Sequence, residues 1–227
     1  MSIANSEVKR VQNLVSSHRK KRDYFTLWEA SLLILLTIVV STGLWYMVGK
    51  TFFWTGIDQN RIKEQLEFLY QKVQAEPKNL EYRVGLGYTY YLNDENEKAM
   101  RELNQVLELD RNYFDGHYNM GLVLTDEGRF DDALEHFQRC VEISPKDYKG
   151  YLQKGVVYRQ MKMYKEAVES LNQASVLMPG RADVIYEIGM VAETKGDLTD
   201  AAGIYKDALR YDPLFKDAQE ALKRVQK

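Results

Sequence analysis

The strongest constraint on the fold of this chain is a residue pattern that recurs every 34 positions. Four glycines keep this interval, and an alanine follows each of them after twelve residues: Gly87, Gly121, Gly155 and Gly189, then Ala99, Ala133, Ala167 and Ala201. A bulky residue stands four positions after each alanine: Leu103, Phe137, Leu171 and Tyr205. All four prolines of the chain, Pro77, Pro145, Pro179 and Pro213, lie on the same lattice. A fixed period of this length predicts an array of stacked structural repeats.

Each period contains two segments with helical spacing of apolar residues, such as 115–125 and 130–143, separated by the polar break 126–129. Two short helices joined by a tight turn cannot bury their apolar stripes alone, so neighbouring pairs must stack. The recurring Gly and Ala predict places where two helix backbones approach closely, and the bulky residue fills the space beside them. Proline ends the second helix of a unit. The pattern predicts an all-α solenoid.

These offsets of Gly, Ala, an aromatic or Leu, and Pro resemble the tetratricopeptide repeat (TPR) family. The resemblance implies a right-handed superhelix of helix hairpins. It places four full repeats at 80–113, 114–147, 148–181 and 182–215, a linker and half-repeat helix at 55–79, and a capping helix at 216–227. Departures occur, because Arg111 stands where proline is expected and Lys154 where Leu or Met is usual.

Ahead of the repeats, the 19 residues from Ser31 to Gly49 carry no charged side chain. A helix of this length is about what a bilayer core of roughly 30 Å requires. We therefore expect a transmembrane signal-anchor helix within 27–54, with aromatic residues on both sides of the span. The basic run at 18–22 precedes the span, which predicts a cytoplasmic tail at 1–26 and repeats on the extracytoplasmic side of the cell membrane.

Other interpretations of the N-terminal part stay open. The small residues at 41–43 are compatible with a cleaved signal peptide, although the apolar run continues past them, and a buried core helix is a further alternative. Val8, Val11 and Val15 share one helical face, so the first segment is either an amphipathic helix on anionic lipid or a basic tail that sets topology.

The resemblance also implies a binding groove, because TPR arrays bind a peptide or helix along the first helix of each unit. The expected groove residues are Val84, Tyr88, Tyr91, Tyr118, Asn119, Leu122, Lys149, Leu152, Gln153, Val156, Arg159, Asp183, Tyr186, Glu187 and Met190. Members that clamp a C-terminal carboxylate use Lys, Asn, Asn, Lys and Arg at five positions. Here those positions hold Val84, Tyr88, Asn119, Lys149 and Gln153. Two of five agree, so we do not expect a carboxylate clamp.

The sequence offers no set of residues for catalysis, a metal or a cofactor. Its single cysteine, Cys140, excludes an intrachain disulfide and falls where the repeat requires a small buried residue. His117 and His136 have no partner at metal-ligand spacing and are expected to be ordinary helix residues. The formal net charge of −2 does not favour nucleic-acid binding. We expect a non-enzymatic protein with no small-molecule substrate.

Two functional hypotheses follow. The chain is either a membrane-anchored adaptor that captures protein partners in its groove, or a permanent structural subunit of a larger membrane complex. TPR proteins of similar layout serve in cytochrome c maturation, translocon-associated folding and envelope or pilus assembly. Fold alone does not choose among such roles.

Overall fold

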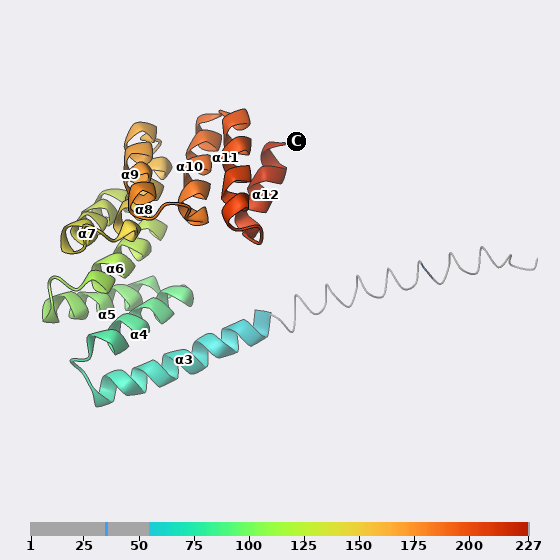
Figure 1. Cartoon of the computed structure of the whole chain (residues 1–227). Helices are drawn as coiled ribbons and strands as arrows, with labels where there is room; N and C mark the ends of the chain where they lie inside the picture. Colours follow the sequence, from blue (N-terminus) through green and yellow to red (C-terminus); the bar gives the residue numbers. More distant parts are fainter. Residues whose placement is uncertain (1–34, 36–54, 227) are drawn as a thin grey trace, which may run out of the picture. The chain divides into compact units, whose positions relative to one another are not determined.

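The structure of the protein is a computed structural model that describes Leu35 and residues 55–226. Within the continuous stretch, every regular element is an α-helix (Figure 1). The helices are α3 (Thr55–Ala75), α4 (Leu80–Leu92), α5 (Asn96–Leu109), α6 (Phe114–Asp126), α7 (Phe130–Ile143), α8 (Tyr148–Gln160), α9 (Tyr164–Leu177), α10 (Ala182–Lys195), α11 (Leu198–Tyr211) and α12 (Lys216–Val225). The prediction of an all-α repeat array is confirmed for this part of the chain.

The predicted membrane span at 31–49 lies outside the described residues, apart from Leu35. Among the helices that the structure does describe, none combines the length and the apolar character that crossing a bilayer requires. The longest of them, α3, has 21 residues and includes the charged side chains Arg61, Lys63 and Glu64.

Four helix hairpins form the repeat array. The pairs are α4 with α5, α6 with α7, α8 with α9, and α10 with α11, and one pair falls in each 34-residue window. The second helix of each hairpin also packs against the first helix of the next hairpin, and α11 packs against α12. In addition, α4 contacts α6 and α8 contacts α10. The first helices therefore line up in one layer and the second helices in another.

The turn inside every hairpin has the same backbone conformation. Asp94, Gly128, Lys162 and Gly196 stand at 34-residue intervals and have φ values of 58°, 72°, 61° and 99°. A left-handed residue lets the chain leave the first helix and reverse within two or three residues. Glycine adopts this conformation without strain, whereas Asp94 and Lys162 adopt it at a cost.

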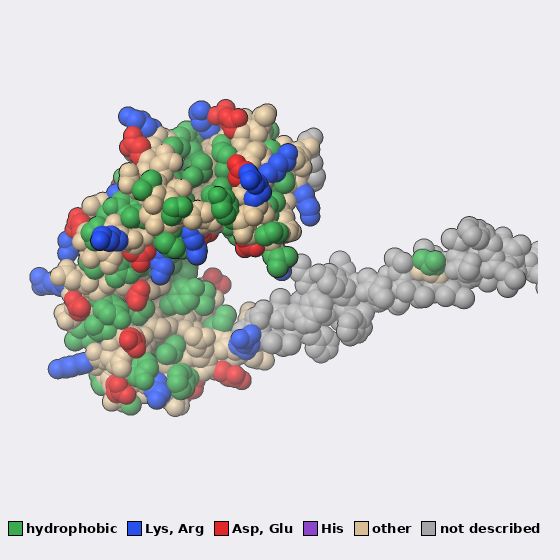
Figure 2. Space-filling view, viewed as in Figure 1, with side chains coloured by type: hydrophobic (Ala, Val, Ile, Leu, Met, Phe, Trp, Pro, Cys, Tyr) green, Lys and Arg blue, Asp and Glu red, His purple; other side chains and the backbone are tan. Residues whose placement is uncertain are grey.

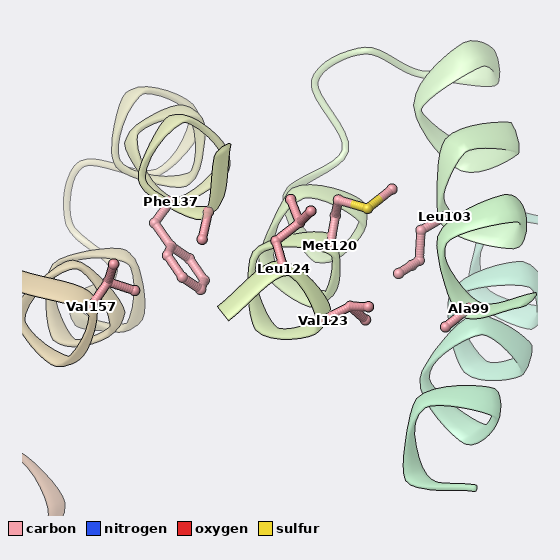
Figure 3. Close-up of a cluster of buried hydrophobic side chains, with 8 residues drawn as sticks. Ala99, Leu103, Met120, Val123, Leu124, Phe137 and Val157 are labelled. Carbon is pink, nitrogen blue, oxygen red and sulfur yellow. The ribbon is translucent and has the colours of Figure 1, made fainter. Parts of the chain in front are cut away.

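The close approach of helices predicted from the recurring glycines is present. A Cβ atom placed on Gly121 would lie 2.6 Å from Cε1 of Phe137, and one on Gly189 would lie 2.5 Å from Cε1 of Tyr205. Phe137 and Tyr205 are fully buried, as are the four recurring alanines. Figure 3 shows Phe137 directed between the helices near Val157, while Ala99 and Leu103 project toward Met120 and Val123 from the other side.

Both ends of the array are covered by single helices. At one end, Leu69 of α3 packs over Gly85, and Val73 of α3 is buried. At the other end, Ala218 and Ala221 of α12 are buried and the helix closes the cluster around Tyr205. The last hairpin would otherwise expose this apolar surface to water.

Candidate partner-binding groove

The face of the first-helix layer that points away from the second helices is lined by side chains at repeated positions. One set of four, which we call the apolar row, follows a 34-residue spacing from α4 to α10 and contains no polar residue except the tyrosine hydroxyl: Tyr88, Leu122, Val156 and Met190. Tyr88 is 39% exposed and the other three are half-buried. Figure 2 shows hydrophobic side chains bordering a hollow on one face of the repeat region. The row therefore provides accessible apolar area on the first helix of every hairpin.

A second set of expected groove residues, four positions earlier in each helix, packs more deeply. Leu152 is 7% exposed and belongs to the core between α8, α9 and α10. It is a packing residue rather than a surface of the groove. Tyr118 and Tyr186 are half-buried. Their rings lie on the core residues Phe137 and Tyr205, with ring centroids 6.1 and 5.7 Å apart respectively.

Tyr118 joins two neighbouring repeats. Its ring stacks on Phe114 at a centroid distance of 6.0 Å, and its hydroxyl accepts a hydrogen bond from Nε2 of Gln153 at 3.2 Å. Burial raises the pKa of the Tyr118 hydroxyl. The ring is therefore held in a fixed position across α6 and α8, which lowers the entropy lost when a partner covers it.

An ion pair joins the next two repeats along the groove. Nη2 and Nε of Arg159 lie 3.0 and 3.2 Å from Oε2 of Glu187, and the two side chains are 14% and 17% exposed. Desolvation raises the pKa of Glu187 even though the charge and hydrogen bonds of Arg159 lower it. The ionised form of the Glu187 carboxylate is therefore stabilised mainly by Arg159.

The end of the groove is closed by a hydrogen-bonded network. Glu193 accepts hydrogen bonds from the Tyr205 hydroxyl at 2.5 Å and from Nε and Nη2 of Arg224 at 2.6 and 2.9 Å. Nη2 of Arg224 also approaches the sulfur of Met190 at 3.8 Å. The last member of the apolar row is thus positioned by the capping helix.

The other expected groove residues form fewer contacts with neighbouring repeats. Tyr88 and Tyr91 lie side by side with ring centroids 6.1 Å apart. Asn119 donates its side-chain amide to the carbonyl of Asp115 at 2.7 Å, within its own helix. Lys149 is exposed at the start of α8.

The groove also carries a row of acidic residues, of which the sequence predicted only Asp183. Glu81, Asp115, Asp183 and Asp217 stand in the first turns of α4, α6, α10 and α12. We call these four the acidic row. They share one lattice position, with Lys149 at the corresponding place in α8, so the 34-residue spacing could have revealed them. Each lies seven residues, two helical turns, before the apolar row or its equivalent, and hence on the same helix face.

Two residues considered separately in the sequence lie together in the structure. His117 and His136 are 19 positions apart, and their Nδ1 atoms are 2.9 Å apart between α6 and α7. Sequence spacing alone could not reveal this contact because it depends on how the hairpin closes. Within the described residues, no group of three or more potential metal ligands occurs.

Cys140 is fully buried, as its place in the repeat predicts. Burial raises the pKa of its thiol to about 12. A thiol so far from ionisation at neutral pH is a poor nucleophile, and its role is packing.

Comparison with known proteins agrees with this architecture. Models described as "Tetratricopeptide repeat" match residues 114–147 and 148–175, and one described as "TPR repeat" matches residues 87–126. The first of these matches coincides with the second repeat assigned from the sequence. The presence of tetratricopeptide repeats is confirmed over 87–175.

Curated relatives and solved structures share the repeats over most of the described chain. Tetratricopeptide repeat protein 6 of Homo sapiens is 27% identical over 159 residues, which are 69% of this chain and 30% of that protein. A thermophilic TPR protein of Thermus thermophilus superimposes with a TM-score of 0.67 at 17% identity, covering 76% of this chain and 94% of that one. YrrB, titled a TPR protein with an unusual peptide-binding site, superimposes with a TM-score of 0.55 at 23% identity, covering 73% and 86%. At these identities the structures show a common fold.

Proposed function

Because residues 87–175 are tetratricopeptide repeats within an α-solenoid, we propose that the protein is a non-enzymatic scaffold whose first-helix groove holds a segment of a partner protein. The observation that carries this proposal is the apolar row, which runs through all four hairpins and is half-exposed. Buried apolar area at the centre of an interface with polar groups around it is typical of protein recognition. The peptide-binding site named for YrrB supports the same use of this fold.

We further propose that the scaffold is anchored in the cell membrane by a single helix and that its repeats are extracytoplasmic. The support lies in the sequence: the uncharged run from Ser31 to Gly49 and the basic residues at 18–22 before it. An anchor restricts the groove to partners at the membrane surface and raises the local concentration of both.

A pair of matched substitutions tests the groove. Val156→Lys places a charge in the apolar row, whereas Val176→Lys makes the same change on α9, where Val176 is 72% exposed. Tagged full-length protein would be cross-linked in cells and its partners identified by mass spectrometry. We expect Val156→Lys to lose the partner that the wild type recovers, while helicity and membrane fractionation stay unchanged. Equal recovery by Val156→Lys and wild type would exclude the groove.

Single cysteines test the orientation. Native Cys140 is buried and unreactive, so it serves as a silent background. Lys165 is exposed on α9, and Ser6 lies in the N-terminal tail. We expect a membrane-impermeant maleimide to label Lys165→Cys in intact spheroplasts and to label Ser6→Cys only after lysis. The reverse pattern would place the repeats in the cytoplasm.

A second function, as a permanent subunit of a larger membrane complex, is favoured by apolar side chains outside the groove. Val176, Tyr211 and Leu214 are 72%, 64% and 83% exposed. This alternative predicts the opposite result from the matched pair: Val176→Lys or Leu214→Lys would lose companions that co-purify in stable proportion, and Val156→Lys would keep them. The same experiment therefore separates the two functions.

A further inference from the structure

The spacing of the apolar row limits which partner conformation can follow it. Where two first helices pack directly, as α4 with α6 and α8 with α10, their axes lie about 8–10 Å apart, so the row advances by about that distance between those hairpins. In an α-helical partner, residues seven positions apart lie about 10.5 Å apart on one face. A helix laid across the first helices would thus present one apolar residue to each repeat.

The width of the groove surface agrees with a helical partner. In the second repeat, acidic Asp115 lies on one side of Leu122 and acidic Asp126 on the other. These carboxylates are eleven residues, about 16 Å, apart along α6. An α-helix with its side chains is about 10–12 Å wide, so it fits between them, whereas a single extended strand is much narrower. An extended strand rises about 3.3 Å per residue, so it would pass one repeat about every three residues. Because its side chains alternate between opposite faces, residues three apart point in opposite directions and could not all contact the apolar row.

The charge at the edge of the groove indicates the charge of the partner helix. Glu81, Asp115 and Asp217 of the acidic row are exposed and form no ion pair within the described residues. The cations nearest the groove are already committed, because Arg159 pairs with Glu187, Arg181 with Asp183 and Arg224 with Glu193. Lys149 alone interrupts the row. The edge of the groove is therefore acidic beside the first and second repeats.

Resting on the proposed groove function, we infer that the occupant is a basic amphipathic α-helix of a partner protein. Apolar residues at every seventh position contact Tyr88, Leu122, Val156 and Met190. Lys or Arg residues along one flank of the helix face Glu81 and Asp115. Complementary charge of this kind sets the direction and register of the helix as well as its rate of association.

Model peptides test the inference with the full-length protein in mild detergent. The probe is a helical peptide of about four heptads with Leu at every seventh position and Lys on the flanks. One control peptide has the same composition with the leucines moved off a single face. A second has Glu in place of Lys, and a third has Leu at every third position in a proline-rich, polyproline II sequence. Fluorescence anisotropy would give each dissociation constant.

Charge reversal at matched positions tests the acidic flank. Glu81→Lys with Asp115→Lys alters the first turns of two first helices, whereas Glu97→Lys with Asp131→Lys alters the exposed first turns of two second helices. Both double variants change the net charge and the helix-end charges equally. We expect the first to weaken binding of the Lys probe about tenfold and the second less than about twofold, with wild-type affinity falling as salt rises from ~50 to ~500 mM.

The possible results separate this inference from the function on which it rests. Tightest binding of the Lys probe, with the expected effects of the two variants, supports it. Equal binding of the Glu peptide, tighter binding of the proline-rich peptide, or equal effects of both charge reversals would overturn it. Absence of any peptide binding would also overturn it, and the groove function would still stand if Val156→Lys loses the cellular partner. If Val156→Lys recovers that partner normally, the function itself fails.

Discussion

Buried His117 and half-buried His136 form a pair in which one ring must donate to the other. Nε2 of His117 lies 3.0 Å from the carbonyl oxygen of Arg111, and this acceptor requires a proton on that nitrogen. In the tautomer that carries its proton on Nε2, Nδ1 of His117 is an acceptor, and Nδ1–H of His136 donates to it at 2.9 Å. The network assigns both tautomers and leaves no room for two charged rings.

This pair makes stability depend on pH. Burial is the main cause that lowers the pKa of His136 from 6.5 to about 4. The neighbouring His117 ring lowers it further, Asp132 opposes the shift, and Arg129 adds a smaller lowering effect. The unfolded chain therefore binds more protons than the native one between these pH values, so stability falls as pH falls from 7 to 4. Because the ring is half-buried and water screens part of the effect, the loss from this residue is about 1–2 kcal/mol by pH 4.

Comparison with His136→Asn isolates this contribution from the carboxylates, which titrate in the same range. The Asn amide can donate from nearly the position of Nδ1, and it does not titrate. We expect the urea-unfolding free energy of His136→Asn to decrease less than that of the wild type between pH 7 and pH 4.5. Parallel curves for the two proteins would show that His136 is not shielded from protons.

The hairpin turns give a second prediction. Lys162 has a φ of 61° and occupies the position that Gly128 and Gly196 hold in other repeats. A left-handed conformation costs a residue with a Cβ about 1–2 kcal/mol. Substitution by glycine relieves this strain, but part of the gain in stability is lost because glycine is more flexible in the unfolded chain. We expect Lys162→Gly to stabilise the protein by about 0.5–1 kcal/mol and Gly196→Ala to destabilise it by about 1 kcal/mol. Thermal melts would measure both changes in stability. If both variants were stabilised or both destabilised, the backbone strain at Lys162 would be contradicted.

Glycine-to-alanine substitutions should have opposite effects at two places. The added Cβ at Gly121 would lie 2.6–3.0 Å from the Phe137 ring, whereas at Gly203 in α11 nothing lies within 4 Å. Crowding of a packed core costs about 1–3 kcal/mol, and replacing an exposed helical glycine gains about 0.5–1 kcal/mol. We expect Gly121→Ala to lower the melting temperature and Gly203→Ala to raise it. A neutral Gly121→Ala would mean that the α6–α7 contact is looser than described.

The sequence predicted the hairpins and their core because one period fixes both. Gly121 and Phe137 are 16 positions apart in one hairpin, and the same pair of roles recurs in every repeat, so their contact could be foreseen. Leu152 shows the limit of that reasoning. It shares its lattice position with the groove residues Tyr118 and Tyr186, but its side chain packs in the core, where it is 7% exposed.

Contacts between repeats could not be foreseen in the same way. The hydrogen bond from Gln153 to Tyr118 and the ion pair of Arg159 with Glu187 depend on the angle at which one hairpin stacks on the next. The repeat pattern does not determine that angle. It also gives no signal for these two contacts, because each pair of residues occurs at only one junction between repeats. Apart from Asp183, the acidic row was accessible from spacing alone and was overlooked because carboxylates in a first helical turn have an ordinary role beside the helix dipole.

The Arg159–Glu187 pair gives the last prediction, which concerns both stability and the charge of the groove. Arg159→Met removes the cation that is hydrogen-bonded to a carboxylate whose pKa is already raised by desolvation. Leaving a largely buried charge alone costs about 1–3 kcal/mol at pH 7.5. Because the folded state of this variant then binds a proton more readily than the unfolded state, its deficit relative to the wild type should shrink as pH falls toward 5.

The double variant Arg159→Met with Glu187→Met distinguishes this electrostatic cause from a loss of packing. Removing both charges leaves no unpaired group, so we expect it to recover most of the stability that Arg159→Met loses, at every pH between 5 and 7.5. Urea unfolding of the three proteins at both pH values would measure the coupling. If the double variant were as unstable as Arg159→Met, and the deficit of the single variant did not change with pH, the arginine would act through its aliphatic contacts. The pair would then contribute nothing to fixing α8 against α10 beside the apolar row.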